Sequence, residues 1–309
     1  MKIFVSFDSA GVKLAGHLYL QPAKAGILRP AIVVGHPGAG VKEQAAGLYA
    51  QRLAQQGFIA LAFDAAHQGE SEGEPRGLED PAHRIEDFKA AVSFLATRDD
   101  VDPNRIGALG ICASGGYVIP AAATDRRIKA VATVSAADIN LQFRFGADGH
   151  QDPAIFQLML DAAAAARIAE VNGDGVGVFQ IFPTEELARS GDLHLFEGWE
   201  YYCSPRAHHP RSASFFTWNS VDRIAHFDAF RFIDLIAPRP LLMIVGTEAV
   251  TSWMSTDAFA NAQEPKELCW VEGATHVALY DKAPYVDAAV SKLGDFFGAK
   301  LGAPATASA

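Results

Sequence analysis

The chain has 309 residues, of which 50% are hydrophobic and 20% are charged, so a disordered or fibrous protein is excluded. Its net charge of −10 argues against a nucleic-acid-binding surface, because phosphate recognition needs clustered lysine and arginine side chains. Three cysteines are too few, and an odd number, for a secreted fold of this size that is held together by disulfides.

The first 135 residues alternate between predicted strands and predicted helices. Short apolar runs between turn residues predict strands at 3–8, 12–20, 30–35, 58–63, 105–111 and 128–135. Apolar residues at helical spacing, with glycine or proline near the ends, predict helices at 43–56, 81–97 and 115–123. Strand followed by helix, repeated from residue 30 onward, predicts a mostly parallel sheet with crossover helices on both faces.

Residues 138–236 interrupt this alternation. They contain helical stretches at 153–170, 184–190 and 222–235 and no convincing strand. The alternation resumes with a strand at 239–246, a helix at 253–263, a strand at 267–271 and a helix at 284–300. We therefore expect an α/β core of residues 1–137 and 237–300, a helical cap or lid at 138–236, and a flexible tail at 301–309. Because the insertion lies between two strands, we expect it beyond the carboxyl edge of the sheet, where ligands bind in open α/β folds.

The N-terminus has no apolar signal region, and the chain contains no run of 18 apolar residues. We therefore expect a soluble cytoplasmic protein with no membrane partner. The negative charge likewise predicts no nucleic-acid partner.

Residues 104–117 run from a strand through a sharp turn into a helix. Such an elbow strains the backbone of its tip residue. It also needs small residues at three positions, namely the second residue before the tip and the second and third residues after it. With the cysteine at the tip, these positions hold Gly110, Ser114 and Gly115, which are all small. With Ser114 at the tip, one of them would hold a bulky tyrosine. The spacing favours Cys112 as a nucleophile; Ser114 as nucleophile, or an inert buried cysteine, is the alternative.

A nucleophilic cysteine needs a base, and His276 follows the last predicted strand in a loop that contains a glycine. A position above the sheet edge would let its ring reach the elbow. The start of a helix and a nearby imidazolium both lower the pKa of a thiol, so we expect Cys112 to be a thiolate. A surface loop histidine is the alternative interpretation of His276.

The acid that would orient His276 should follow the strand at 239–246. Glu248 is the only carboxylate in that loop, and Asp138, just past the strand that ends near residue 135, is the alternative acid. A site without an acid also stays open, because a cysteine needs less help from a base-orienting acid than a serine does.

The glycine-containing loop at 35–40 follows the third predicted strand. A tetrahedral intermediate needs two backbone N–H donors aimed at its oxygen. One is expected from Ala113, directly after the nucleophile, and the other from Gly38, because Pro37 has no N–H. An ordinary strand-to-helix turn is the alternative for this loop.

The remaining histidines and cysteines suggest no metal site. His208 and His209 are adjacent, so their side chains point apart, and no third ligand follows at a typical spacing. No phosphate-binding loop is present either. We expect no cofactor and no metal, and we expect Cys203 and Cys269 to take no part in the chemistry.

At the elbow, the glycine loop and the histidine, the chain resembles the α/β-hydrolase superfamily. The pattern Gly110-x-Cys112-x-Ser114-Gly115 is similar to the elbow of dienelactone hydrolases, which also use cysteine. The longer stretches 109–117, 265–268 and 273–276 resemble bacterial hydrolases that are related to fungal polyketide transferases and thiohydrolases. The resemblance implies an α/β-hydrolase fold with a helical lid and acyl-transfer chemistry.

The expected activity is hydrolysis of an ester, thioester or lactone through a thioacyl-enzyme, with a small-molecule acyl substrate as the partner. An acyltransferase that uses the same site is one alternative. A non-catalytic ligand-binding protein of the same fold is another, and a homodimer stays open.

Overall fold

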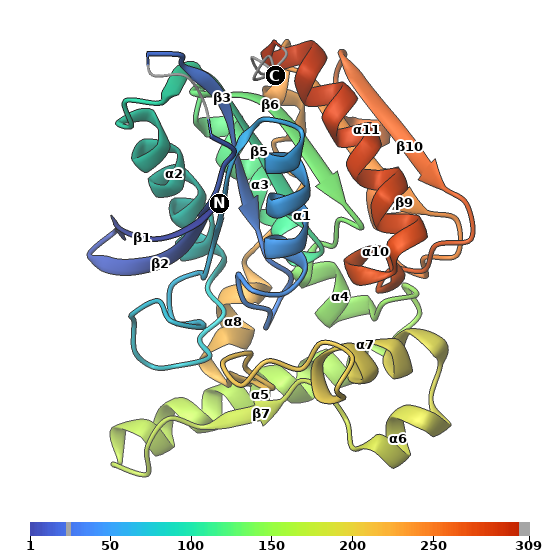
Figure 1. The fold of residues 1–309 in the computed structure, drawn as a ribbon. Coiled ribbons are helices and arrows are strands. Elements are labelled where there is room, and N and C mark those ends of the chain that lie inside the picture. Colours follow the sequence, from blue (N-terminus) through green and yellow to red (C-terminus); the bar gives the residue numbers. More distant parts are fainter. Residues whose placement is uncertain (23–25, 303–309) are drawn as a thin grey trace.

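An eight-stranded, mostly parallel sheet forms the centre of the protein (Figure 1). The structure, a computed structural model, describes residues 1–22 and 26–302, so most of the expected tail at 301–309 lies outside the described residues. The strand order is β1-β2-β4-β3-β5-β6-β9-β10. The strands are β1 (Lys2–Ser9), β2 (Val12–Tyr19), β3 (Arg29–Gly35), β4 (Ile59–Phe63), β5 (Val101–Ile111), β6 (Ile128–Val134), β9 (Leu241–Gly246) and β10 (Lys266–Val271). The β1–β2 and β2–β4 pairs are antiparallel and all other neighbouring pairs are parallel, as the alternation predicts.

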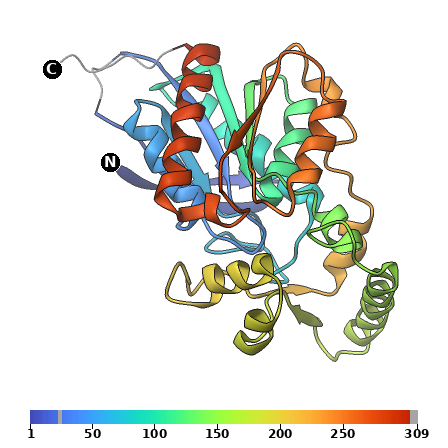
Figure 2. The same cartoon turned by 90° about the vertical axis from the view of Figure 1, so that its right-hand side faces the viewer.

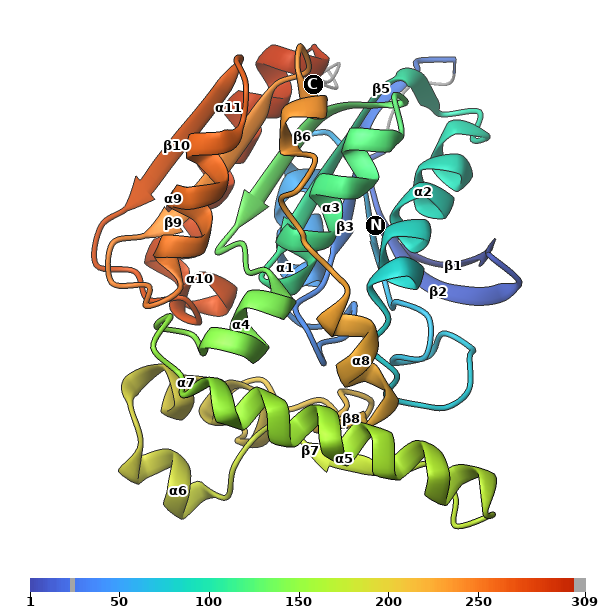
Figure 3. The same ribbon diagram turned by 180° about the vertical axis from the view of Figure 1, so that it is seen from behind.

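Helices cover both faces of this sheet. One face packs against α1 (Ala45–Gln55) and α11 (Ala283–Leu301), and the opposite face packs against α2 (Pro81–Ala96), α3 (Ala113–Thr124) and α9 (Ser252–Asn261) (Figures 1 and 3). Successive side chains of a strand point to opposite faces, so Val33 packs in one core and its neighbours Ile32 and Val34 pack in the other. This double burial explains why the central strands read as continuous apolar runs. No helix in the described part of the chain is long and apolar enough to span a bilayer.

The chain between β6 and β9 lies across the carboxyl ends of the parallel strands (Figure 2). Its elements are α4 (Ile139–Phe145), α5 (Pro153–Val171), β7 (Val178–Gln180), α6 (Glu185–Ser190), α7 (Leu193–Cys203), β8 (Phe215–Thr217), α8 (Asn219–Ala225) and the 3₁₀ helix η1 (Ile233–Ile236). Four of these helices begin at a residue whose side chain accepts a backbone N–H, namely Asp138, Asp152, Thr184 and Asp192. Such N-caps stabilise helix starts and mark the boundaries.

The helix predicted at 222–235 is divided into the shorter α8 and η1, and α4 was not predicted. Two further features of this segment also differ from the expectation. It contains strands, because β7 and β8 pair antiparallel over three residues each. Strands this short give no recognisable alternation of apolar and polar residues. The sequence also missed α7, in which aromatic and apolar residues stand at most positions and obscure the helical spacing.

Candidate active site

Cys112 lies at the sharp turn between β5 and α3. Its backbone has φ of 55° and ψ of −121°, a conformation that residues other than glycine rarely adopt. A Cβ at Gly110 would lie 2.0 Å from the carbonyl oxygen of Ser114, so only glycine fits there. The backbone carbonyl of Cys112 accepts hydrogen bonds from the N–H groups of Gly115 at 2.7 Å and Ala137 at 3.0 Å. These contacts hold the strained turn and aim the cysteine side chain out of the sheet.

Ser114 lies two residues further on and does not line the pocket that borders Cys112. Its hydroxyl donates to the carbonyl of His36 at 2.6 Å, and Arg84 Nη2 donates to the same hydroxyl at 3.3 Å. The side chain is buried against Gly35, the last residue of β3. The structure therefore places Cys112, and not Ser114, at the tip of the elbow.

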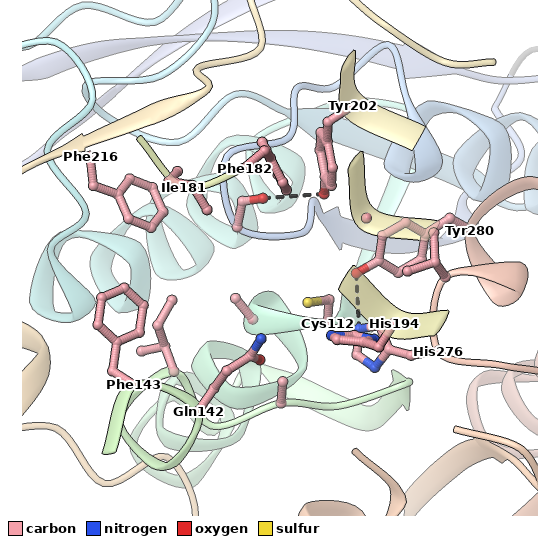
Figure 4. A pocket seen from close by; sticks show the side chains of 16 residues that line it. Cys112, Gln142, Phe143, Ile181, Phe182, His194, Tyr202, Phe216, His276 and Tyr280 are labelled. Carbon is pink, nitrogen blue, oxygen red and sulfur yellow. Dashed lines mark hydrogen bonds between the residues drawn. The ribbon is translucent and has the colours of Figure 1, made fainter. Parts of the chain in front are cut away.

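His276 follows β10 and lies at the same end of the sheet, fully enclosed by other side chains (Figure 4). Its Nε2 atom lies 3.0 Å from the Tyr280 hydroxyl, and its Nδ1 atom lies 2.5 Å from the Thr251 hydroxyl. The ring of His194, from α7, stands edge-on at 5.2 Å. Burial, assisted by His194, holds the pKa of His276 well below its usual value, so the resting imidazole is neutral.

Neither predicted acid reaches this ring. Glu248 is exposed, and its backbone N–H bonds to Ala274, because β9 turns tightly against the loop that precedes His276. Asp138 is buried and caps α4, where its carboxylate accepts the N–H groups of Asn140 at 2.7 Å and Ala229 at 2.8 Å. Among the described residues, no carboxylate bonds to either nitrogen of His276. The predictions of Glu248 and Asp138 as the orienting acid therefore need correction.

A hydroxyl occupies the position predicted for the acid. Thr251 comes three residues after Glu248, is buried, and bonds to Nδ1 of His276. The sequence analysis missed Thr251 because it considered only carboxylates in this loop.

Three hydrogen-bond donors near Cys112 favour the charged form of its thiol and so act to lower its pKa. They are the Tyr280 hydroxyl and the backbone N–H groups of Ala113 and Gly38. Gly38 and Ala113, whose amides were expected to form the oxyanion hole, line the same pocket as Cys112. Gly38 is held in place in part by the Tyr202 hydroxyl, which donates to its carbonyl at 3.2 Å.

The protonation state of the cysteine differs from the expectation. Burial raises the pKa of Cys112 above its usual value and outweighs the opposing effect of these donors. The neutral His276 supplies no imidazolium charge. The resting site therefore holds a neutral thiol and a neutral imidazole instead of the expected thiolate.

Tyr280 was also missed by the sequence analysis. It lies on the short helix α10 (Ala278–Asp281), four residues after His276. A separation of four residues puts two side chains on the same face of a helical turn. The spacing His276-x-x-x-Tyr280 was thus a usable signal, although only the fold shows that the two side chains bond to each other and line one pocket with Cys112.

A pocket of about 120 Å³ opens above Cys112 (Figure 4). Side chains of the segment between β6 and β9 form most of its wall, whereas Cys112, Ala113 and His276 form its floor. The wall residues from that segment are mainly aromatic and aliphatic, and include Ile139, Phe143, Ile181, Phe182, Tyr202 and Phe216. The pocket therefore offers an apolar site to one part of a ligand and directs its polar end to the floor.

A buried ion-pair cluster holds the loop that contains Gly38. The ammonium group of Lys42, which is fully buried, lies 2.7 Å from Asp64 and 2.6 Å from Glu70. Asp64 also accepts the backbone N–H of Lys42 at 2.7 Å. Arg211, from the segment between β6 and β9, reaches Glu70 at 3.3 Å and so connects this cluster to the covering layer.

The unusual protonation states lead to a prediction about pH. Alkylation of Cys112 by iodoacetamide should be slow at neutral pH and rise through a midpoint above pH 9, because the pKa of the thiol is raised by burial. Hydrolytic activity should fall on acidification only below pH 6.5, because the pKa of His276 is lowered and its base form persists. Among the described residues, the titratable and charged groups that act on the pair include His194, Tyr202, Tyr280 and Arg84. Alkylation rates mapped to the Cys112 peptide measure the thiol; fast labelling at pH 6 would contradict the prediction.

A second prediction concerns Thr251. Thr251→Val removes the hydroxyl beside Nδ1 of His276 and leaves a buried polar group without a partner, which costs about 1–3 kcal/mol. We expect kcat/KM to fall roughly 10- to 100-fold, because the ring loses the contact that orients it. Thr251→Ser keeps the hydroxyl and is the matched control, with activity close to the parent. Equal activity of the valine and serine variants would show that the hydroxyl has no positioning role.

The geometry of the site agrees with comparisons to known proteins. Residues 16–137 match the dienelactone hydrolase family. The chain is 39% identical to the uncharacterized protein YcjY of Escherichia coli strain K12, over 95% of this chain and 96% of that protein. The chain belongs to the dienelactone hydrolase family. A dienelactone is a cyclic ester, so this family member is a hydrolase that acts on ester bonds.

Two further proteins extend the comparison. The uncharacterized protein PA2218 of Pseudomonas aeruginosa is 38% identical over 88% of this chain and 74% of that protein. Its crystal structure matches with a TM-score of 0.91 over 97% of this chain and 94% of that chain. The thiohydrolase aneE of Aspergillus aculeatus is 40% identical over 42% of this chain and 39% of that protein. The fold is that of the α/β hydrolases, as the sequence predicts.

Proposed function

We propose that this dienelactone hydrolase family member cleaves esters and thioesters of short apolar acyl groups, with Cys112 as the nucleophile. The observation that supports this most directly is the position of Cys112. It lies at the strained tip of the elbow and on the floor of an apolar pocket. The N–H groups of Gly38 and Ala113 and the ring of His276 border the same floor. A nucleophile, a base and two oxyanion donors are the set that acyl transfer requires.

The reaction proceeds in two halves. The sulfur of Cys112 attacks the carbonyl carbon and its proton passes to His276, while the carbonyl oxygen becomes an oxyanion held by the N–H groups of Gly38 and Ala113. The bond to the leaving oxygen or sulfur then breaks, and His276 returns its proton to that atom, which leaves a thioacyl-enzyme. Water attacks this thioester, and its proton passes to His276. Collapse releases the carboxylic acid and restores the thiol of Cys112 with that proton.

The size and chemistry of the pocket support a short acyl group. A dry apolar cavity of about 150 Å³ in another protein accommodates benzene, so a pocket of about 120 Å³ suits an acyl chain of roughly six carbons or fewer. Phe143, Ile181 and Phe216 would contact this chain. In this proposal, residues 138–236 act as a lid that shapes the acyl site and excludes water from it.

The neutral resting site supports thioesters as substrates alongside esters. Without a carboxylate, His276 is a weak base, so substrates with good leaving groups react most readily. A thiolate is a better leaving group than an alkoxide because thiols are more acidic than alcohols. The fungal relative aneE, which is named a thiohydrolase, agrees with this preference.

Trapping the thioacyl-enzyme tests the proposal. The enzyme is mixed with p-nitrophenyl butyrate or a butyryl thioester, quenched with acid within the first turnovers, and analysed by intact mass and peptide mapping. We expect one butyryl group on Cys112 and faster turnover of butyryl than of decanoyl substrates. A butyryl group on Ser114, or turnover without any adduct, would overturn the proposal. Adding an alcohol and measuring ester product against free acid distinguishes acyl transfer from hydrolysis.

A further inference from the structure

The hydroxyl of Tyr280 lies between the sulfur and the imidazole. It is 3.0 Å from Nε2 of His276 and also interacts with the sulfur of Cys112. Among the described residues, no direct hydrogen bond joins Cys112 to His276. Figure 4 shows Tyr280 above Cys112, with a hydrogen bond to the histidine. The Tyr280 hydroxyl therefore bonds to the base and borders the same pocket as the sulfur.

We propose that Tyr280 is a catalytic residue that relays the proton between Cys112 and His276. The inference rests on the proposed function, since it concerns the same nucleophile and the same base. It assigns to Tyr280 a step that a direct contact between cysteine and histidine would otherwise perform.

The hydrogen bonds of the site fit one direction of transfer. If Nδ1–H of His276 donates to the Thr251 hydroxyl, Nε2 is free to accept the O–H of Tyr280. The Tyr280 oxygen is then left to accept the S–H of Cys112, which borders the same pocket (Figure 4). Both histidine nitrogens are thereby satisfied, and a continuous path runs from the thiol to the base.

The transfer leaves Tyr280 unchanged. As the sulfur–carbon bond forms, the thiol proton moves to the Tyr280 oxygen, and the Tyr280 proton moves to Nε2 of His276. When the leaving group departs, the Tyr280 hydroxyl gives its proton to the leaving oxygen or sulfur. The proton on Nε2 of His276 then returns to the Tyr280 oxygen. Burial and the nearby Cys112 raise the pKa of Tyr280, so it stays protonated and acts without forming a lasting phenolate.

The surroundings of Tyr280 hold its hydroxyl in place. Tyr280 is 2% exposed, and the Tyr49 hydroxyl donates to the carbonyl of the preceding residue, Leu279, at 2.7 Å. The ring of Tyr201 packs edge-on at 5.1 Å. The Tyr201 hydroxyl instead accepts the N–H of Ala45, outside the pocket. Tyr201 is thus a neighbouring buried tyrosine whose hydroxyl has an ordinary structural partner.

Two tyrosine variants and one solvent measurement test the relay. In Tyr280→Phe, which keeps the ring, we expect the rate of the acylation burst with p-nitrophenyl butyrate to fall at least about 100-fold, the usual effect of removing a proton-transfer group. In Tyr201→Phe, the matched control, we expect a rate within about threefold of the parent. Retention of the parent rate by Tyr280→Phe would overturn the relay.

The solvent measurement is independent of how well any variant folds. Acylation rates of the unmodified enzyme in mixtures of H₂O and D₂O should curve downward with deuterium fraction, because two protons move in one step. A straight line would mean that one proton moves and would overturn the relay. In Tyr280→Phe the residual rate should give a straight line, which a merely structural role for the hydroxyl would not produce.

The outcome also separates the relay from the proposed function. If the mapped butyryl group is absent from Cys112, the proposed function fails and the relay fails with it. If the substrate acylates Cys112 of the Tyr280→Phe variant at the parent rate, only the relay fails. If acylation of Cys112 slows in the Tyr280→Phe variant but not in the Tyr201→Phe variant, the proposed function and the relay are both supported.

Discussion

Cys112→Ala is expected to lower kcat/KM for butyryl esters by roughly 10³- to 10⁶-fold, the range seen when a catalytic nucleophile is removed. In the proposed reaction the sulfur forms the only covalent bond between enzyme and acyl group, so the alanine variant would keep just the pocket and the two amide donors. Ser114→Ala removes a buried hydrogen bond to His36 and should cost about 1–3 kcal/mol of stability. Its kcat/KM should stay within about tenfold of the parent, because its hydroxyl does not face the pocket.

These predictions are checked by measuring the initial rate of p-nitrophenol release by each purified variant, with thermal unfolding as a check of the fold.

Cys112→Ser is a third variant for the same measurement. A serine needs a strong base, and His276 is held by the Thr251 hydroxyl instead of a carboxylate, so this variant should also lose most activity. An active Cys112→Ala enzyme, or an inactive but folded Ser114→Ala enzyme, would show that Cys112 is not the nucleophile.

Asp64→Ala is expected to lower the free energy of unfolding by about 3–5 kcal/mol, the cost of breaking a buried ion pair. This cost applies because Glu43 and Glu70, the other carboxylates that contact Lys42, are both partly exposed. Lys42 cannot reach solvent, because its side chain has 0% exposure, and Asp64 is its buried counter-ion. The same carboxylate accepts the backbone N–H groups of Lys42 and Glu70. Because this loop presents Gly38 to the site, we expect kcat/KM to fall together with stability.

Glu70→Ala is the matched control for Asp64→Ala. Glu70 contacts the same ammonium group at 2.6 Å, but its side chain is 37% exposed, so its removal should cost less than about 1 kcal/mol. Urea unfolding followed by circular dichroism measures both variants against the parent. Equal losses for the two variants would contradict a buried Lys42–Asp64 pair as the main anchor of the loop.

The fold and the nucleophile turn could be predicted because their signals are local. Continuous apolar runs mark strands that are buried on both faces, and β5 and β6 follow directly from them. The elbow depends on contacts within six residues, where a Cβ at Gly110 would meet the backbone of Ser114. Such steric rules act over one turn of chain, so spacing alone places Cys112 at the tip.

The orienting group of His276 could not be predicted, because it depends on a contact between two loops. Gly246 lies so close to Ala274 that a Cβ there would come within 2.0 Å of a carbonyl oxygen. This approach turns Glu248 toward solvent and brings Thr251 to the ring. No pattern within either loop contains that information.

Strand periodicity and elbow spacing are local properties, so they were enough to predict the α/β-hydrolase fold and to single out Cys112 and His276. The groups that surround the sulfur, and the protonation states that they adopt, depend on contacts between distant segments and so could be seen only in the folded protein. Tyr280 and Thr251 reach His276 from different elements, and Tyr202 and His194 come from α7, outside the sheet. Burial by these distant segments raises the pKa of Cys112 and lowers that of His276, since a pKa depends on everything that excludes water from the group.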